Sequence, residues 1–91
     1  MHRHRKFRSP PSKLAGYNKR GEIWINKKVP RRLRARLRRH EEVEIGFRKK
    51  GMTYKQAHRL ALKAEHRGLT RRQIAVYEGE LGAIARTSKY R

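Results

Sequence analysis

The chain has 91 residues, of which 27 are lysine or arginine and seven are glutamate, with no aspartate, so its formal net charge is +20. This length allows one small domain with a modest core, and the absence of cysteine excludes disulfides and thiolate chemistry. No apolar run approaches the ~20 residues that span a bilayer, and the basic N-terminus lacks the apolar segment of a signal peptide. We therefore expect a cytoplasmic protein without a membrane segment, whose self-repulsion is relieved by a polyanionic partner.

Residues 1–20 are basic throughout and contain no acidic residue. The cations of this stretch are Arg3, Arg5, Lys6, Arg8, Lys13, Lys19 and Arg20. So many like charges with so few apolar residues predict an extended basic tail that becomes ordered only on a partner. His2 and His4 would add hydrogen-bond donors for phosphate in such a tail.

A short β-hairpin is predicted next, from two extended runs at residues 14–17 and 22–25 that are separated by a turn ending in Gly21. An isolated hairpin is marginal in water, so this one must pack on helices or on the partner. Trp24, the only tryptophan, has two interpretations. It is either a core anchor against the first helix or a platform for an unstacked base.

The first helix is predicted over residues 30–49, with Pro30 suited to the first helical position. Its inward stripe recurs at helical spacing and comprises Leu33, Leu37, His40, Glu44 and Phe47. The charge changes sign along this helix, because arginines surround the stripe in the first half and glutamates occupy the second half. The first half therefore faces an anion, and the second half faces positive or protonatable groups on later segments.

Two more helices begin at capping boxes, Thr53 with Gln56 and Thr70 with Gln73. Glycines precede both starts and mark the ends of the helices before them. The second helix should run to about residue 66 and the third from 71 to about 86. The expected fold is mainly α: a small three-helix domain with a short β-hairpin over residues 21–86, an extended basic tail over 1–20 and a short basic C-terminal tail over 87–91.

Residues 40–44 read H-E-E-V-E, and this H-E-x-x-E helix resembles the H-E-x-x-H helix of zinc proteases, with the resemblance extending to His58. It implies that His40, Glu44 and His58 ligate zinc and that Glu41 is the base for a bound water. The competing interpretation is a salt-linked interior. In that case Glu44, Glu65 and Glu78 meet His58, His66 or arginines between the helices. The sequence favours the salt-linked interior, with no cofactor, no metal, no catalytic residue and no small-molecule substrate.

A helix-turn-helix DNA-binding protein is a further alternative, since residues 68–70 join the second and third helices by a short turn. Arg71 and Arg72 would then touch a groove. A reader of base edges usually places amides beside its arginines, and here only Gln73 is near, where it is already part of a cap.

The charge is distributed unevenly, with fifteen lysines and arginines against one glutamate in residues 1–39, and twelve against six in residues 40–91. In composition and layout the chain is similar to small basic ribosomal proteins, and its arginine-rich, amide-poor profile is similar to that of a thermophilic archaeon. The resemblance implies a structural rRNA-binding role in the ribosome, in which phosphates are neutralised, with neighbouring ribosomal proteins as further partners. The RNA-binding residues predicted are Arg3, Arg5, Lys6, Arg8, Lys13, Lys19, Arg20, Trp24, Lys27, Lys28, Arg31, Arg32, Arg34, Arg36, Arg38 and Arg39.

Overall fold

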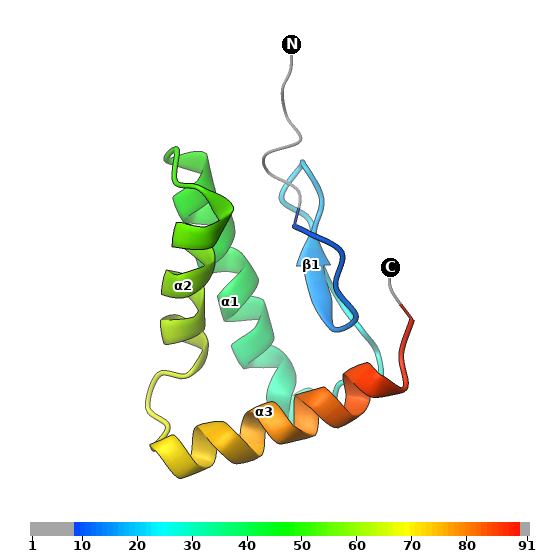
Figure 1. Ribbon diagram of the computed structural model, residues 1–91. Helices are drawn as coiled ribbons and strands as arrows, with labels where there is room; N and C mark the ends of the chain where they lie inside the picture. Colours follow the sequence, from blue (N-terminus) through cyan, green and yellow to red (C-terminus); the bar gives the residue numbers. More distant parts are fainter. Residues whose placement is uncertain (1–8, 90–91) are drawn as a thin grey trace.

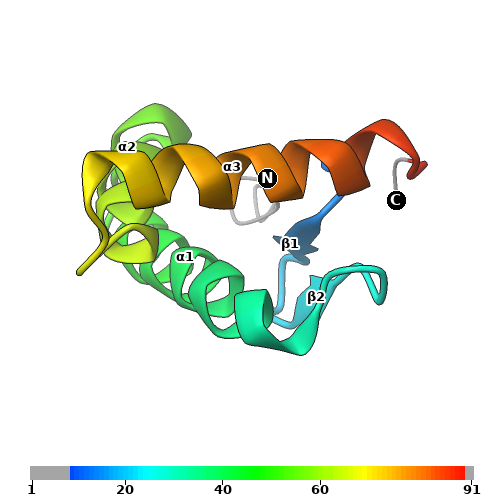
Figure 2. The same cartoon turned by 90° about the horizontal axis from the view of Figure 1, so that it is seen from below.

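A computed structural model describes residues 9–89 of the chain and confirms a small, mainly α fold with one hairpin (Figure 1). Its elements in chain order are β1 (Ala15–Tyr17), β2 (Ile23–Ile25), α1 (Arg31–Lys49), α2 (Tyr54–Glu65) and α3 (Arg71–Arg86). Helix α1 lies between α2 and the hairpin, and α3 lies across the end of the molecule where α1 begins and α2 ends (Figures 1 and 2). The longest helix therefore contacts elements on two of its sides.

The hairpin is antiparallel and pairs Gly16 with Trp24 between two flanking pairs. A Cβ added to Gly16 would lie 2.8 Å from Nε1 of Trp24, so the indole covers the glycine. Side chains alternate across a strand, and Tyr17 reaches Glu44 of α1, so Trp24 lies on the opposite face. It is half-buried against the hairpin and does not anchor the core against α1.

The helix ends follow the predicted capping. The hydroxyls of Thr53 and Thr70 accept hydrogen bonds from the backbone N–H of Gln56 and Gln73, and both glutamine side chains accept in return. Pro30 differs from expectation: it is the N-cap of α1, in extended conformation with ψ of 147°, and the helix begins one residue later. The capping boxes fix where α2 and α3 start.

An apolar core joins the hairpin, α1 and α3. Its buried members are Ala15, Val29, Leu33, Leu37, Tyr77 and Leu81. Helix α2 contributes Ala57 and Ala61, both fully buried, and these small side chains let α2 approach α1 closely. Because Ala15 and Tyr17 are buried, the packed part of the chain extends to the N-terminal side of the boundary predicted at residue 21.

Candidate functional site

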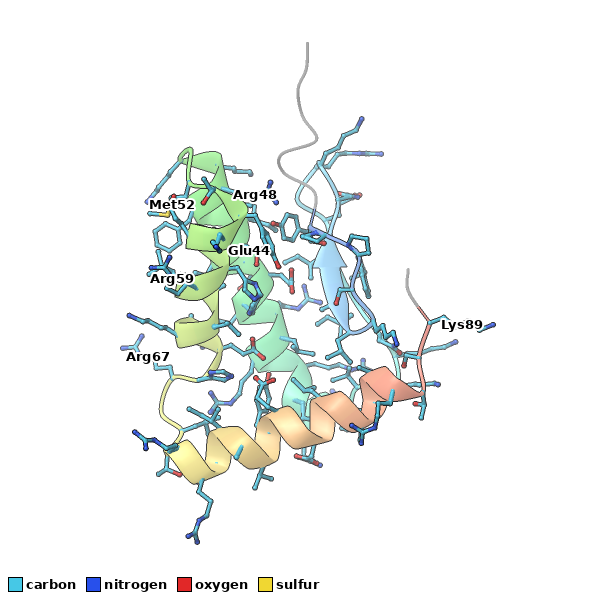
Figure 3. All side chains as sticks on the ribbon, viewed as in Figure 1. Glu44, Arg48, Met52, Arg59, Arg67 and Lys89 are labelled. Carbon is cyan, nitrogen blue, oxygen red and sulfur yellow. The ribbon has the colours of Figure 1, made fainter. Side chains whose placement is uncertain are left out.

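Five polar residues meet between α1 and α2, and we call them the His–Glu centre: His40, Glu41 and Glu44 of α1 with His58 and Glu65 of α2. Four are buried, and only His58 is partly exposed. Figure 3 shows Glu44 inside the molecule, whereas Arg59, Arg67 and Lys89 extend away from it. The structure thus brings together His40, Glu44 and His58, the three residues that the zinc-protease resemblance singled out.

His40 connects the two helices through both ring nitrogens. Its Nδ1 lies 2.7 Å from Oε1 of Glu65, and its Nε2 lies 3.1 Å from Oε1 of Glu44. Burial lowers the pKa of His40, but the hydrogen bonds to Glu44 and Glu65 outweigh that effect and raise the pKa to about 10. The ring is therefore a cation at neutral pH that donates to a carboxylate from each side.

Glu44 is the most heavily bonded carboxylate of the centre and is 1% exposed. The hydroxyl of Tyr17 donates to its Oε2 at 2.5 Å, and Nδ1 of His58 lies 3.2 Å from its Oε1. Burial raises the pKa of Glu44, but hydrogen bonds from His40, Tyr17 and His58 outweigh it and keep the pKa below the usual range. Glu44 is thus held as an anion.

Tyrosines surround the centre. The hydroxyl of Tyr77 donates to Oε2 of Glu65 at 2.6 Å, and the ring of Tyr54 stacks on His58 with 5.1 Å between centroids. The roles of Tyr17 and Tyr77 were not predicted. Alternation in the hairpin places Tyr17 on the face of Ala15, which was a usable signal. The contact of Tyr77 on α3 with Glu65 on α2 depends on how these two helices pack, which no sequence pattern indicates.

Glu41 differs from the other carboxylates of the centre. It is 6% exposed, and no hydrogen bond or ion pair joins its side chain to another residue within 9–89. Burial raises its pKa to about 7. Its side chain lines a cavity of about 330 Å³ together with His40, Glu44 and His58. The sequence placed Glu41 beside the inward stripe, and the structure buries it.

The predicted contacts of the glutamates between the helices are confirmed at two positions. Glu44 meets His58, and Oε2 of Glu78 lies 2.6 Å from Nε2 of His66. The ring of His66 also packs edge-on against Tyr77. This second pair links α3 to the end of α2 at the surface, outside the His–Glu centre.

The six arginines in the first half of α1 fall into two groups. Arg34 donates to the carbonyl oxygens of Val29 and Lys27, and Arg36 donates to those of Glu65 and Arg67. These two side chains therefore hold the start of α1 and the end of α2.

The other four arginines in the first half of α1 are exposed. Arg32 pairs with Glu80 of α3. The side chains of Arg31, Arg38 and Arg39 make no hydrogen bond or ion pair with any other residue that the structure describes. We call these three the free arginines of α1, and they remain available to an anion.

Four arginines line one surface cleft of about 320 Å³ between α1 and the end of α2: Arg32, Arg36, Arg39 and Arg67, with Ala35 and Ala64 beside them. We call it the arginine cleft. Guanidinium groups match the geometry of phosphate. Arg67 was not among the predicted residues, because only the fold brings the segment after α2 beside the first half of α1.

The remaining predicted RNA-binding residues are dispersed. Arg3, Arg5, Lys6 and Arg8 lie outside the described residues. Lys19 and Arg20 are exposed in the hairpin turn, Lys27 is exposed before α1, and Lys13 is half-buried. The amino group of Lys28 donates to the carbonyl oxygen of Thr87 at 2.9 Å and so fixes the segment that follows α3.

The residues of the helix-turn-helix alternative are also placed. Arg71 and Arg72 are exposed at the start of α3. The side-chain oxygen of Gln73 accepts from the backbone of Thr70 at 2.9 Å, so the one nearby amide is engaged in its cap. Nothing in this arrangement favours base readout over phosphate contact.

No family model, no curated protein and no solved structure matches the chain. Among residues 9–89, none of the helices has the length and apolar character needed to cross a membrane.

Proposed function

We propose that the protein is a structural RNA-binding component of the ribosome, which stabilises folded ribosomal RNA by neutralising its phosphates. The observation that carries this proposal is where the fold places its charged residues. Three of the seven glutamates are buried in the His–Glu centre, so the surface is more cationic than the net charge of +20 suggests. A surface of this kind attracts polyanions over long range.

The geometry of α1 supports phosphate contacts. The three free arginines and three of the four arginines of the cleft belong to one helix, which fixes the spacing between the points where their side chains are attached. Phosphates that RNA tertiary folding brings together need such fixed counter-charges. We therefore assign the principal contact surface to the first half of α1 and the adjoining end of α2.

The ribosome and the cytoplasm are the proposed location. The unevenly basic first 39 residues suit crevices between RNA helices better than a regular DNA groove. The test is sedimentation: the protein should travel with ribosomal subunits in a gradient and should leave them at high salt, because counterion release drives the binding.

The contact surface is tested by a matched pair of triple variants. Arg31→Gln, Arg38→Gln and Arg39→Gln together should flatten the log–log dependence of RNA affinity on salt by ~2 units or more, since each lost phosphate contact removes a little under one. The control replaces Lys55, Arg59 and Lys63 on the exposed face of α2, with the same loss of charge.

The control should change the slope clearly less than the α1 variant. Equal flattening by both variants would contradict a localised surface on α1. Equal affinity for ribosomal RNA and for duplex DNA of the same length, at the same salt, would contradict the assignment to RNA.

A further inference from the structure

The His–Glu centre contains more than a salt-linked interior requires. One ligand atom each from His40, Glu44 and His58 can be chosen so that all three lie within 4.8 Å of one another. The two imidazole rings are 4.9 Å apart between centroids and meet edge to face. Two imidazoles and a carboxylate form a ligand set that zinc accepts, with a fourth position left for water.

The groups behind these ligands have the arrangement that orients metal ligands. Nδ1 of His40 is bonded to Glu65, which leaves Nε2 of the ring directed to Glu44. A carboxylate on the far nitrogen of a ligating histidine fixes the ring and increases its basicity. Glu65 is itself held by Tyr77, and Glu44 by Tyr17, so the positions of both carboxylates are fixed.

Glu41 supplies an independent observation. Its carboxylate is more than nine-tenths buried, lines the same cavity as the three ligands and has no hydrogen-bond partner within residues 9–89. A buried polar group without a partner requires an explanation, such as a bound ion or water. A water on the open position of a metal would give this carboxylate its missing donor.

The charge of the centre also permits a divalent cation. Without a metal, the centre's carboxylates Glu41, Glu44 and Glu65 face His40 and His58, with Arg48 adjoining through the hydroxyl of Tyr17. A divalent cation bound to neutral imidazoles would bring two positive charges next to these three carboxylates. The carboxylates can compensate that charge, and binding would release the proton that His40 carries without the metal.

We propose that His40, Glu44 and His58 bind one zinc ion at the wall of this cavity, with Glu65 orienting His40 and Glu41 facing the open coordination position. This inference goes beyond RNA binding and is independent of it, because the arginine cleft lies outside the centre.

The experiment uses the full chain, dialysed against a chelator and then titrated with Zn²⁺ by calorimetry and with Co²⁺ by visible absorption. We expect one ion per chain and Co²⁺ bands typical of a four-coordinate site. His58→Ala should lower zinc affinity on the order of 100-fold or more, since it removes a direct ligand. The side chain of His58 is 37% exposed, so this variant should remain folded, which circular dichroism verifies.

Two controls separate this site from other histidines. His66→Gln tests the neighbouring group of Glu65, His66 and Glu78, whose ligand atoms also lie within 4.8 Å. A variant with His2→Gln and His4→Gln tests the N-terminal segment. Both controls should bind zinc like the parent chain, and His58→Ala should keep the salt-dependent RNA affinity.

The proposal is overturned if the parent chain takes up no zinc. It is also overturned if His58→Ala binds zinc as tightly as the parent, or if either control removes the stoichiometric ion.

Discussion

The arginine cleft and the His–Glu centre both lie between α1 and α2, and both consist of charged side chains. The surroundings of those side chains differ between the two. In the cleft, three of the four arginines are exposed, Arg36 is half-buried, and one sign dominates. In the centre, both signs are buried and each of His40, Glu44 and Glu65 has at least two partners. Burial and the number of hydrogen-bond partners, rather than charge alone, therefore distinguish the interior centre from the surface cleft.

The largest difference between the two regions should appear when one buried carboxylate is removed. Glu44→Ala in the zinc-free protein leaves His40 with one partner fewer and the hydroxyl of Tyr17 without an acceptor. We expect a loss of roughly 3–5 kcal/mol in the free energy of unfolding, as for other broken buried pairs. Urea denaturation followed by circular dichroism measures it. Glu42→Ala, an exposed neighbour on the same helix, is the control and should change stability little.

Replacing Glu41 should have the opposite effect on stability to replacing Glu44, because the buried side chain of Glu41 has no hydrogen bond to another residue within 9–89. Its folded pKa of about 7 lies above its ordinary value of 4.5, so the folded state holds the proton more tightly. The stability of the parent chain should therefore fall as pH rises from 4.5 to 7 and the carboxylate becomes charged. Glu41→Gln should remove that fall and stabilise the zinc-free protein at pH 8 by up to about 3 kcal/mol.

Urea denaturation at pH 4 and pH 8 measures this difference, with Glu42→Gln as the matched surface control. At pH 4 the gain should be small, because Glu41 is then protonated in both states. A Glu41→Gln variant that is less stable at pH 8 would show that a cation or a donor already satisfies this carboxylate.

The surface pair between α1 and α3 should show the smallest effect. The side chains of Arg32 and Glu80 are 63% and 37% exposed. Pairs in this setting are screened by salt and contribute little. A double-mutant cycle with Arg32→Ala and Glu80→Ala should give a coupling near the limit of detection that disappears at high salt. Coupling as large as the effect of Glu44→Ala would remove the distinction between the two regions.

Local signals in the sequence predicted the secondary structure well. Capping boxes at Thr53 and Thr70 and a two-run hairpin signal depend on neighbouring residues, so they can be read without the fold. Periodicity also placed Leu33, Leu37, His40 and Glu44 on one buried face of α1. The hairpin was expected, but the face on which Trp24 lies was not. That face depends on the strand register, which pairs Trp24 with Gly16.

The candidate site was predicted only in part, for a related reason. His40, Glu44 and His58 were found through helical spacing, which relates residues on one helix or on adjacent helices. Tyr17 and Arg67 meet their partners on α1 across long stretches of the chain. Tyr77 meets Glu65 across the turn between α2 and α3, and no spacing rule connects these residues. The sequence also did not show which α1 arginines are free and which are bonded within the protein. Arg34 and Arg36 donate to carbonyl oxygens whose positions are set by the fold.

The four-residue connection between α1 and α2 has a consequence for how the molecule forms. All five residues of the His–Glu centre lie within 26 positions of one another, on two antiparallel helices that nucleate next to each other (Figure 1). Contacts between residues close in sequence require little loop closure, so such helical pairs form early in folding. We expect α1 and α2 to assemble first, with His40, Glu44 and His58 already adjacent. The strand bearing Tyr17 and the helix bearing Tyr77 then close over a centre that already exists.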